Sequence, residues 1–375
     1  MSIANEIATV FEKIAPYNQQ QIEEALRFLI KSNQFKDGAR YFYPNWSDAV
    51  IEEKLKSCHS CADFQTAFVV PMLDDLIENS INELNVYGLD EICKEGNHLF
   101  ISNHRDIFID AALLQHWLHY NDYTYTEISL GDNLMVDELI ERVAKLNNMY
   151  TVYRNGSKIE LVKNAINLSA YLRHSIVEKK VSSWIAQGNG RAKDGFDKTS
   201  PGLVRMLLMS GRKNLKKALE ELNIVISSVS YELEPCALEK AVELQTREKT
   251  GAYKRSKYEN INSIVKGIVE PKGDVCLHFE KLDIEKIDFS GDLKSTVAAI
   301  TAEMDRLIYK NYRLYKTNYM GYDLLYEVSE YSGYYNKEDL LIFSSYIQSQ
   351  SENIDIQHRL LKIYANPVLN KKIRC

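Results

Sequence analysis

The chain has 375 residues and a formal net charge of −6, from 46 Lys and Arg against 52 Asp and Glu. Hydrophobic residues make up 45% of the chain and charged residues 26%, a globular composition that excludes a disordered or fibrous protein. The acidic balance also argues against a dedicated nucleic-acid-binding protein, whose binding domain is normally basic. Any anionic ligand would therefore need a local cluster of cations.

Three features of the sequence bear on location. No run of apolar residues approaches the length of about 18 that a membrane-spanning helix needs. The first residues include acids and lack the basic and apolar regions of a secretory signal. Six cysteines are scattered along the chain without the pattern of a disulfide framework. These features predict a protein of the reducing cytoplasm, without a spanning helix.

The first part of the chain, residues 1–85, has apolar residues at helical spacing and predicts helices, notably over 22–34, 48–57 and 68–84. From residue 86 the pattern alternates between strands and helices. Strands are expected at 85–88, 98–103, 124–131, 149–154, 181–188, 224–235 and 274–283, and helices at 107–120, 136–148, 158–179, 201–210 and 214–223. After residue 290 helices are expected again, over 295–312, 337–350 and 357–369.

This alternation predicts an α/β fold with a mixed, mostly parallel sheet flanked by helices. We expect a helical N-terminal region over 1–85, an α/β domain over 86–285 and a helical C-terminal region over 286–375. No linker rich in Pro, Gly or Ser separates these parts, which favours one body with helical additions at both ends.

The segment SNHRDIFIDAALL places His104 where a predicted strand ends and a helix begins. Side chains at the carboxyl ends of strands in an open α/β sheet lie where ligands bind. An imidazole oriented by a carboxylate can take a proton from a hydroxyl group. Asp106 and Asp110 are both available as the carboxylate, although Asp106 could instead cap the helix. A protein-kinase loop is excluded, because Ala111 stands where that loop requires Asn.

A glycine-rich segment, QGNGRAKDGFDKTSPG, follows the strand expected at 181–188. Gly190 and its neighbouring glycines let the backbone approach a ligand closely. Arg191 and Lys193 are cations suited to a phosphate group, with Arg able to bind it bidentately. Arg154 ends the strand expected at 149–154 and adds a third cation at the same edge of the sheet. A solvated surface loop is the alternative interpretation of this segment.

Two other patterns in the sequence give little indication of function. Cys58 and Cys61 have the spacing of metal ligands, but no second pair lies nearby, so we expect no zinc site. The apolar segment IVISSVSYELEP predicts mainly a central strand.

Taken in order, SNHRDIFID, TVYRNG, IAQGNGRAKDGFDKTSPGLVRM and SSVSYELEP resemble the four motifs of the glycerolipid acyltransferase family, which includes glycerol-3-phosphate and lysophosphatidate acyltransferases. The resemblance covers roughly residues 85–285. The distance from His104 to Asp110 is one residue longer than the family's usual spacing, so Asp110 and Asp106 both remain candidates, with Asp110 favoured. The third motif has Gln187 and Asn189 where a Glu is usual, which leaves the acceptor open.

The resemblance implies transfer of a fatty acyl group from a thioester, acyl-CoA or acyl carrier protein, to a hydroxyl of glycerol-3-phosphate or a lysophosphatidate-like acceptor in phospholipid synthesis. His104 would be the general base and Asp110 or Asp106 would orient it. Arg154, Gly190, Arg191 and Lys193 would bind the acceptor phosphate. Backbone N–H groups at the start of the following helix could stabilise the oxyanion. No metal or other cofactor is expected.

The expected lipid product implies peripheral contact with the inner face of a membrane, for which the segment 201–222 is a candidate because it mixes Leu and Met with Arg and Lys. A buried helix followed by a solvated amphipathic helix is the alternative. Two other functions remain open: an acyltransferase for another lipid acceptor, and a catalytically silent relative that binds acyl chains or acyl carrier protein.

Overall fold

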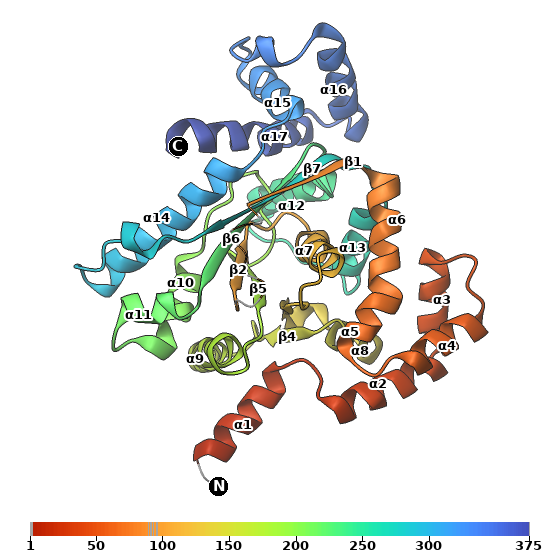
Figure 1. Ribbon diagram of the computed structural model, residues 1–375. Coiled ribbons are helices and arrows are strands. Elements are labelled where there is room, and N and C mark those ends of the chain that lie inside the picture. The colour runs from red at the N-terminus through yellow and green to blue at the C-terminus, as the bar shows by residue number, and fades with distance from the viewer. Residues whose placement is uncertain (1–2, 89, 91, 93, 95–96, 375) are drawn as a thin grey trace.

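The computed structural model describes residues 3–88, 90, 92, 94 and 97–374, and its centre is a seven-stranded sheet with helices on both faces (Figure 1). The expected α/β fold with a mixed, mostly parallel sheet is confirmed. The strands are β1 (Ile81–Tyr87), β2 (Leu99–Ser102), β3 (Glu127–Gly131), β4 (Met149–Val152), β5 (Ser183–Ala186), β6 (Ile224–Tyr231) and β7 (Gly273–Lys281).

The strand order is β1-β7-β6-β2-β5-β3-β4, and β6 and β7 are the one antiparallel pair of neighbours in this sheet. The five strands from β6 to β4 therefore run in the same direction and end at the same edge. This edge is where an open α/β sheet normally binds its ligands.

Two layers of helices cover the sheet, as Figure 1 shows. One face is packed by α1 (Ile3–Ile14), α9 (Lys158–Arg173), α10 (Pro201–Leu208), α11 (Leu215–Glu220) and α14 (Leu293–Asn311). The other face is packed by α6 (Val70–Ser80), α7 (Ile109–Tyr120) and α13 (Glu259–Val269). Both layers bury side chains of β2, which is buried along its whole length: Leu99 and Ile101 face the first layer and Phe100 the second. A short apolar strand of this kind is typical of the centre of a parallel sheet.

The helices α10 and α11 correct one expectation. Their apolar side chains are buried in the core of the first layer, including those of Val204, Leu207 and Leu219. The segment 201–222 is therefore a buried helix followed by a solvated amphipathic one, and it does not present the apolar face that contact with a membrane requires.

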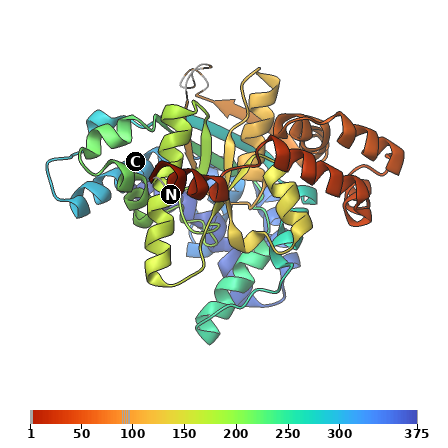
Figure 2. The same cartoon turned by 90° about the horizontal axis from the view of Figure 1, so that it is seen from below.

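A separate apolar core lies among the N-terminal helices and α8 (Glu138–Leu146). The N-terminal helices are α2 (Gln19–Lys31), α3 (Asn33–Phe42), α4 (Asp48–Ser57) and α5 (Cys61–Phe64). Cys58 and Cys61 are buried in it. The helix expected over 68–84 ends at Ser80, and Ile81 begins β1. The apolar spacing of these residues fits both structures, and pairing with β7 decides for the strand. Figure 2 shows α1 crossing the sheet beside α9.

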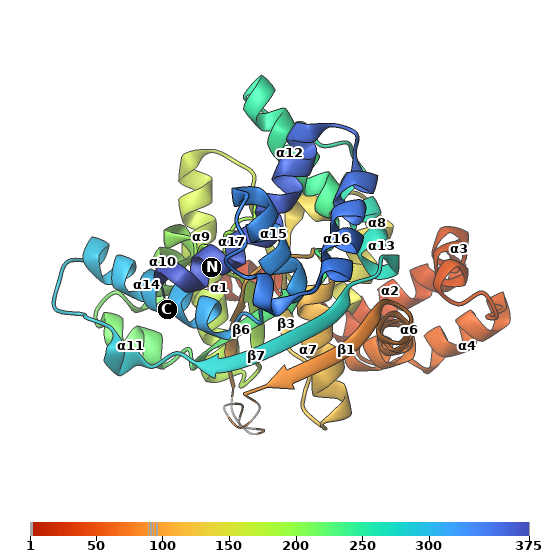
Figure 3. The same cartoon turned by 90° about the horizontal axis from the view of Figure 1, so that it is seen from above.

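The C-terminal helices α15 (Lys316–Tyr326), α16 (Lys337–Gln350) and α17 (Ile354–Arg374) lie beside α12 (Ala237–Thr250), as Figure 3 shows. They bury a common apolar cluster that includes Ala241, Met320 and Tyr364. Among the described residues, none of the helices combines the length and the apolar character needed to cross a bilayer.

Candidate active site at the carboxyl edge of the sheet

His104 lies directly beyond the end of β2 and forms a hydrogen bond with a carboxylate of α7. Its Nδ1 is 2.9 Å from Oδ2 of Asp110, and its side chain is 13% exposed. A carboxylate can only accept hydrogen bonds, so Nδ1 carries the proton and Nε2 has the free lone pair. In the described part of the chain, no hydrogen bond reaches Nε2. The imidazole is thus held on one side and free to accept a proton on the other.

Asp110 receives hydrogen bonds from three further donors. The backbone N–H groups of Arg105 and Asp106 donate to Oδ2 over 2.7 and 2.9 Å, and the Tyr231 hydroxyl donates to Oδ1 over 2.8 Å. Burial, with the nearby Asp110 carboxylate, holds the pKa of Tyr231 well above its usual range, so this phenol remains a donor. Four donors fix the orientation of the carboxylate, and the carboxylate fixes the orientation of His104.

Asp106 caps a helix and is not the hydrogen-bond partner of His104. Its Oδ1 accepts hydrogen bonds from the backbone N–H groups of Phe108 and Ile109, over 2.8 and 2.9 Å, and so caps the start of α7. Burial raises the pKa of Asp106, the Asp110 carboxylate adds to this effect, and Arg191 opposes it. Of the two candidate acids, Asp110 is the one that is hydrogen-bonded to His104.

These contacts occupy four of the backbone N–H groups at the start of the helix, where the oxyanion donors are expected. The backbone N–H groups of Arg105 and Asp106 are bound by Asp110, and those of Phe108 and Ile109 are bound by Asp106. All four are therefore unable to stabilise a developing oxyanion while both carboxylates keep their positions.

A buried network of four charged residues supports this turn. The guanidinium of Arg105 is 0% exposed and binds Asp197 through two nitrogens, at 2.7 and 2.9 Å, and Glu234 at 3.0 Å. Lys240 of α12 binds Glu234 at 2.5 Å and the carbonyl oxygen of Arg105 at 2.6 Å. The positive charges of the two cations balance the negative charges of the two carboxylates. The four side chains join the β2–α7 turn to the glycine-rich loop and to α12.

The glycine-rich loop is bonded to the turn that contains His104 and to the C-terminal helix α17. The Ala192 N–H donates to the carbonyl oxygen of His104 over 2.7 Å. Further along, Asn366 and Asn370 of α17 donate to the carbonyl oxygens of Asp194 and Gly195. The C-terminal helix therefore helps to set the conformation of the loop.

Gly190 and Gly195 form a matched pair for testing this attachment. Both have positive φ, of +90° and +82°, but a Cβ at Gly190 would meet no atom within 4 Å, whereas one at Gly195 would collide with the backbone of Ile363 in α17. We expect Gly190→Ala to cost about 1–2 kcal/mol from backbone strain alone. Gly195→Ala should cost about 1–3 kcal/mol more, because the helix must move. Urea denaturation of both variants checks this, and equal losses would contradict the contact with α17.

The cations of the loop have different surroundings. Arg191 is half-buried, its Nη1 is buried without a hydrogen-bond partner, and its charge acts on Asp106. Lys193 is 3.2 Å from the buried carboxylate of Glu243, which Arg247 and Arg255 also bind. Burial lowers the pKa of Lys193, while Glu243 acts in the opposite direction. Arg255 also lies 3.7 Å from Glu259, so three cations face two carboxylates and leave one positive charge in excess beside the loop.

Arg154 lies at the end of β4, where its backbone N–H donates to Asp132. Burial lowers the pKa of Arg154, the Asp132 carboxylate opposes this effect, and the charge of Arg255 adds to it. Arg154 also lines a cavity of about 250 Å³ together with Gly188 and Asn189 of the glycine-rich loop. The rest of the lining is largely apolar and comes from α1, β4, β5, α9 and α10, with Ile14, Val152, Leu161, Ala165, Leu168, Ile185, Leu203 and Met206 among its members.

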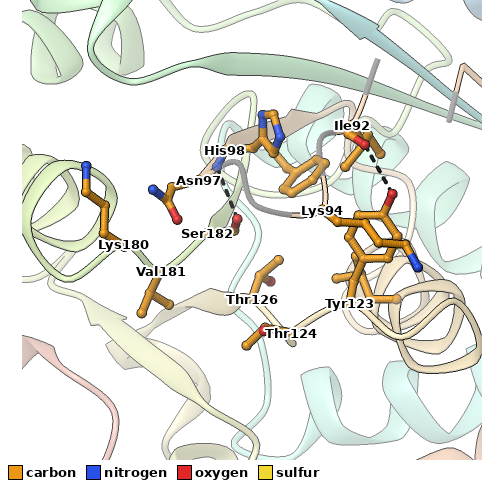
Figure 4. A pocket seen from close by; sticks show the side chains of 12 residues that line it. Ile92, Lys94, Asn97, His98, Tyr123, Thr124, Thr126, Lys180, Val181 and Ser182 are labelled. Atoms are coloured by element: carbon orange, nitrogen blue, oxygen red, sulfur yellow. Dashed lines mark hydrogen bonds between the residues drawn. The ribbon is translucent and has the colours of Figure 1, made fainter. Parts of the chain in front are cut away.

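A second cavity, of about 270 Å³, lies at the opposite edge of the sheet, where β2, β3 and β5 begin (Figure 4). Its lining includes His98, Thr126 and Ser182, with Lys94 and Lys180 at its sides. The residues predicted for the site do not line this cavity, and they gather instead around the carboxyl edge.

Comparisons with known proteins give little beyond this geometry. No family model matches the chain, and no curated protein matches it. Among solved structures, the 1-acyl-sn-glycerophosphate (LPA) acyltransferase PlsC from Thermotoga maritima is similar with 13% identity and a TM-score of 0.40, over 78% of this chain and 95% of that one. The signal recognition particle receptor FtsY from Elizabethkingia anophelis is similar with 10% identity and a TM-score of 0.23, over 80% of this chain and 97% of that one. At these values neither structure supports a conclusion about the activity of this chain.

The sequence pattern did not assign roles to several residues of this site. Tyr231 was expected only as part of a central strand, and Glu243 and Arg255 were not expected near the loop at all. A tyrosine at the end of an apolar strand was the one available signal, since a buried hydroxyl needs a hydrogen-bond partner.

Proposed function

We propose that this protein is an O-acyltransferase that moves an acyl group from a thioester to a hydroxyl of a phosphorylated glycerol or lysophosphatidate-like acceptor. The observation that carries the proposal is the pair of His104 and Asp110 at the carboxyl edge of the sheet, 2.9 Å apart, with Nε2 of the imidazole free. The four motifs that resemble glycerolipid acyltransferases support the same reaction. The excess of positive charge beside the glycine-rich loop favours an anionic acceptor.

In this reaction, Nε2 of His104 takes the proton of the acceptor hydroxyl as its oxygen attacks the thioester carbonyl carbon. A C–O bond forms, the C–S bond breaks, and the leaving thiolate takes the proton back from the imidazolium. Asp110 stabilises the imidazolium and keeps Nδ1 protonated throughout. A general base of this kind contributes a rate factor of about 10²–10⁴, and holding both substrates together contributes further.

The acceptor site would be formed by Arg154, Lys193 and Arg255, together with Arg191 of the glycine-rich loop. The cavity beside Arg154 is lined by that arginine, by the glycine-rich loop, by many aliphatic side chains, and by the polar side chains of Ser129, Thr151, Asn164 and Ser200. This combination fits an amphiphile whose anionic head is held by the arginines and whose chain lies between α9 and α10. His104 does not line the cavity, and the loop from Gly188 to Ala192 connects the two.

The experiment that tests the proposal measures thiol release from acyl-CoA and from acyl carrier protein, with a panel of acceptors. We expect release that depends on glycerol-3-phosphate or a lysophosphatidate. Release that depends instead on an unphosphorylated lipid acceptor would indicate an acyltransferase with another substrate. Tight binding of thioesters without any acceptor-dependent release would indicate a silent acyl-binding protein and would contradict the proposal.

The acceptor site makes a separate prediction for Arg255, which no motif contains. Arg255→Ala should raise the KM for a phosphorylated acceptor about tenfold or more, because a hydrogen bond to a charged group contributes about 1.5–3 kcal/mol. The kcat and the KM for the thioester should change little, since the contact is the same in the ground and transition states. Arg212→Ala, an exposed arginine before α11, is the matched control. An unchanged acceptor KM would remove Arg255 from the site.

A further inference from the structure

One helix of the active-site edge leaves an apolar face uncovered. On α9, Ile159 is 82% exposed, Val162 53% and Ile166 45%. Their spacing places them on one side of the helix, and we call these three residues the α9 stripe. The beginning of α9 is fixed by a capping box between Ser157 and Glu160, so the stripe is held on an ordered helix. Leaving three aliphatic side chains in water has a free-energy cost that a partner could remove.

The cavity beside Arg154 adjoins this stripe. Leu161, Ala165 and Leu168 of α9 line the cavity, and Leu161 is also 37% exposed. Leu161 is therefore the residue that links the exposed surface of α9 with the cavity, which Asn164 of the same helix also lines.

Two exposed lysines lie on α9 with the stripe, and further cations lie in the chain around the end of α12. Lys158 and Lys163 of α9 are exposed and form no ion pair within the described residues. The chain from 247 to 257, at the end of α12 and beyond it, contains five Lys and Arg against one acid. In this segment Lys254 and Lys257 are also exposed and outside every ion pair of the described residues. Figures 2 and 3 show the beginning of α9 and the end of α12 projecting toward the same side.

We propose that the α9 stripe, with these flanking lysines, docks the protein on the surface of an anionic lipid bilayer. Exposed aliphatic side chains together with lysines are the combination that binds the interface of an anionic membrane. A lipid surface fits better than an acidic carrier protein, because α9 carries the exposed aliphatic stripe and also contributes Leu161, Ala165 and Leu168 to the cavity. The inference rests on the proposed function for its purpose, since a lipid acceptor would enter the cavity from the bilayer.

The test is co-sedimentation of the full chain with vesicles of phosphatidylcholine containing phosphatidylglycerol, compared with vesicles of phosphatidylcholine alone. We expect binding to the anionic vesicles that weakens as salt is added. The triple variant Ile159→Asp, Val162→Asp, Ile166→Asp should bind at least about tenfold less, because the inserted apolar area is lost. The variant Leu341→Asp, Ile342→Asp alters similarly exposed residues of α16, 69% and 64% exposed, and should bind like the unaltered protein.

A second variant keeps the proposal open to contradiction if the triple variant folds poorly. Lys254→Glu with Lys257→Glu should weaken binding to anionic vesicles and leave the residual binding to phosphatidylcholine unchanged. Failure of the unaltered protein to bind anionic vesicles, or unchanged binding by both variants, would overturn the proposal. Binding of the stripe to acyl carrier protein, with none to vesicles, would overturn it in favour of a carrier.

The two proposals can fail separately. His104→Ala should bind vesicles as the unaltered protein does, because docking does not require turnover. The triple variant should keep its kcat on a short-chain, water-soluble thioester, because the stripe residues do not line the cavity. Vesicle binding without any turnover would therefore preserve the docking surface and remove the acyltransferase.

Discussion

Replacing His104 with Ala should lower kcat for acyl transfer by about 10²–10⁴-fold, the usual contribution of a general base. The fold should survive the change, because Asp110 keeps three donors: the backbone N–H groups of Arg105 and Asp106 and the hydroxyl of Tyr231. Steady-state thiol release measures the loss, and thermal unfolding checks that the variant remains folded.

His116 of α7 provides a control, because it is also an imidazole bonded to a carboxylate. Its Nε2 is 2.9 Å from Asp74 and its side chain is 16% exposed, so the distance and the exposure of the imidazole match those of His104, although Asp74 is 45% exposed and Asp110 is buried. Its partner belongs to α6 and not to the carboxyl edge of the sheet. His116→Ala should leave kcat within about threefold of the unaltered enzyme, since it touches no reacting atom. A His104→Ala enzyme with full activity would contradict the assignment of the base.

Replacing Arg105 with Met should lower the free energy of unfolding by about 3–5 kcal/mol, because the change leaves buried charges without a partner. Asp197 and Glu234 would then share a single cation, Lys240, in a region where all of these side chains are at most 5% exposed. Urea denaturation measures the loss. Adding Asp197→Asn should recover part of it, since the second change removes one of the unpaired charges.

Arg40 is the control for this prediction. It pairs with Asp37 and Asp48, as Arg105 pairs with two carboxylates, but its side chain is 38% exposed. Ion pairs at the surface contribute about 0–1 kcal/mol, so Arg40→Met should have a small effect. If Arg105→Met cost no more than Arg40→Met, the buried network would not be a source of stability.

The sheet could be predicted because its strands are short, apolar and separated by helical patterns. β2 and β5 are buried at every residue, and such runs between turn signals are typical of central parallel strands. The same reasoning placed His104 at a strand end. It could not separate residues 81–84 from the helix before them, because those residues become a strand only by pairing with β7.

The surroundings of His104 could not be predicted from spacing. Asp106 and Asp110 were both candidates by spacing, and backbone N–H groups of the turn bind both carboxylates, so the choice depends on the geometry of the folded turn. Asp106 caps the helix, and this leaves Asp110 for the imidazole. The partners of Arg105 were beyond prediction for another reason: Asp197 and Glu234 are 92 and 129 residues away along the chain.

The most direct test of the proposed activity is incubation of the purified protein with a labelled acyl thioester and a phosphorylated glycerol acceptor, followed by identification of the product. The account predicts an ester between the labelled acyl group and the acceptor hydroxyl, formed together with free thiol and absent when His104→Ala replaces the unaltered protein. Thiol release that yields only free fatty acid, or a labelled ester formed equally well by His104→Ala, would contradict it.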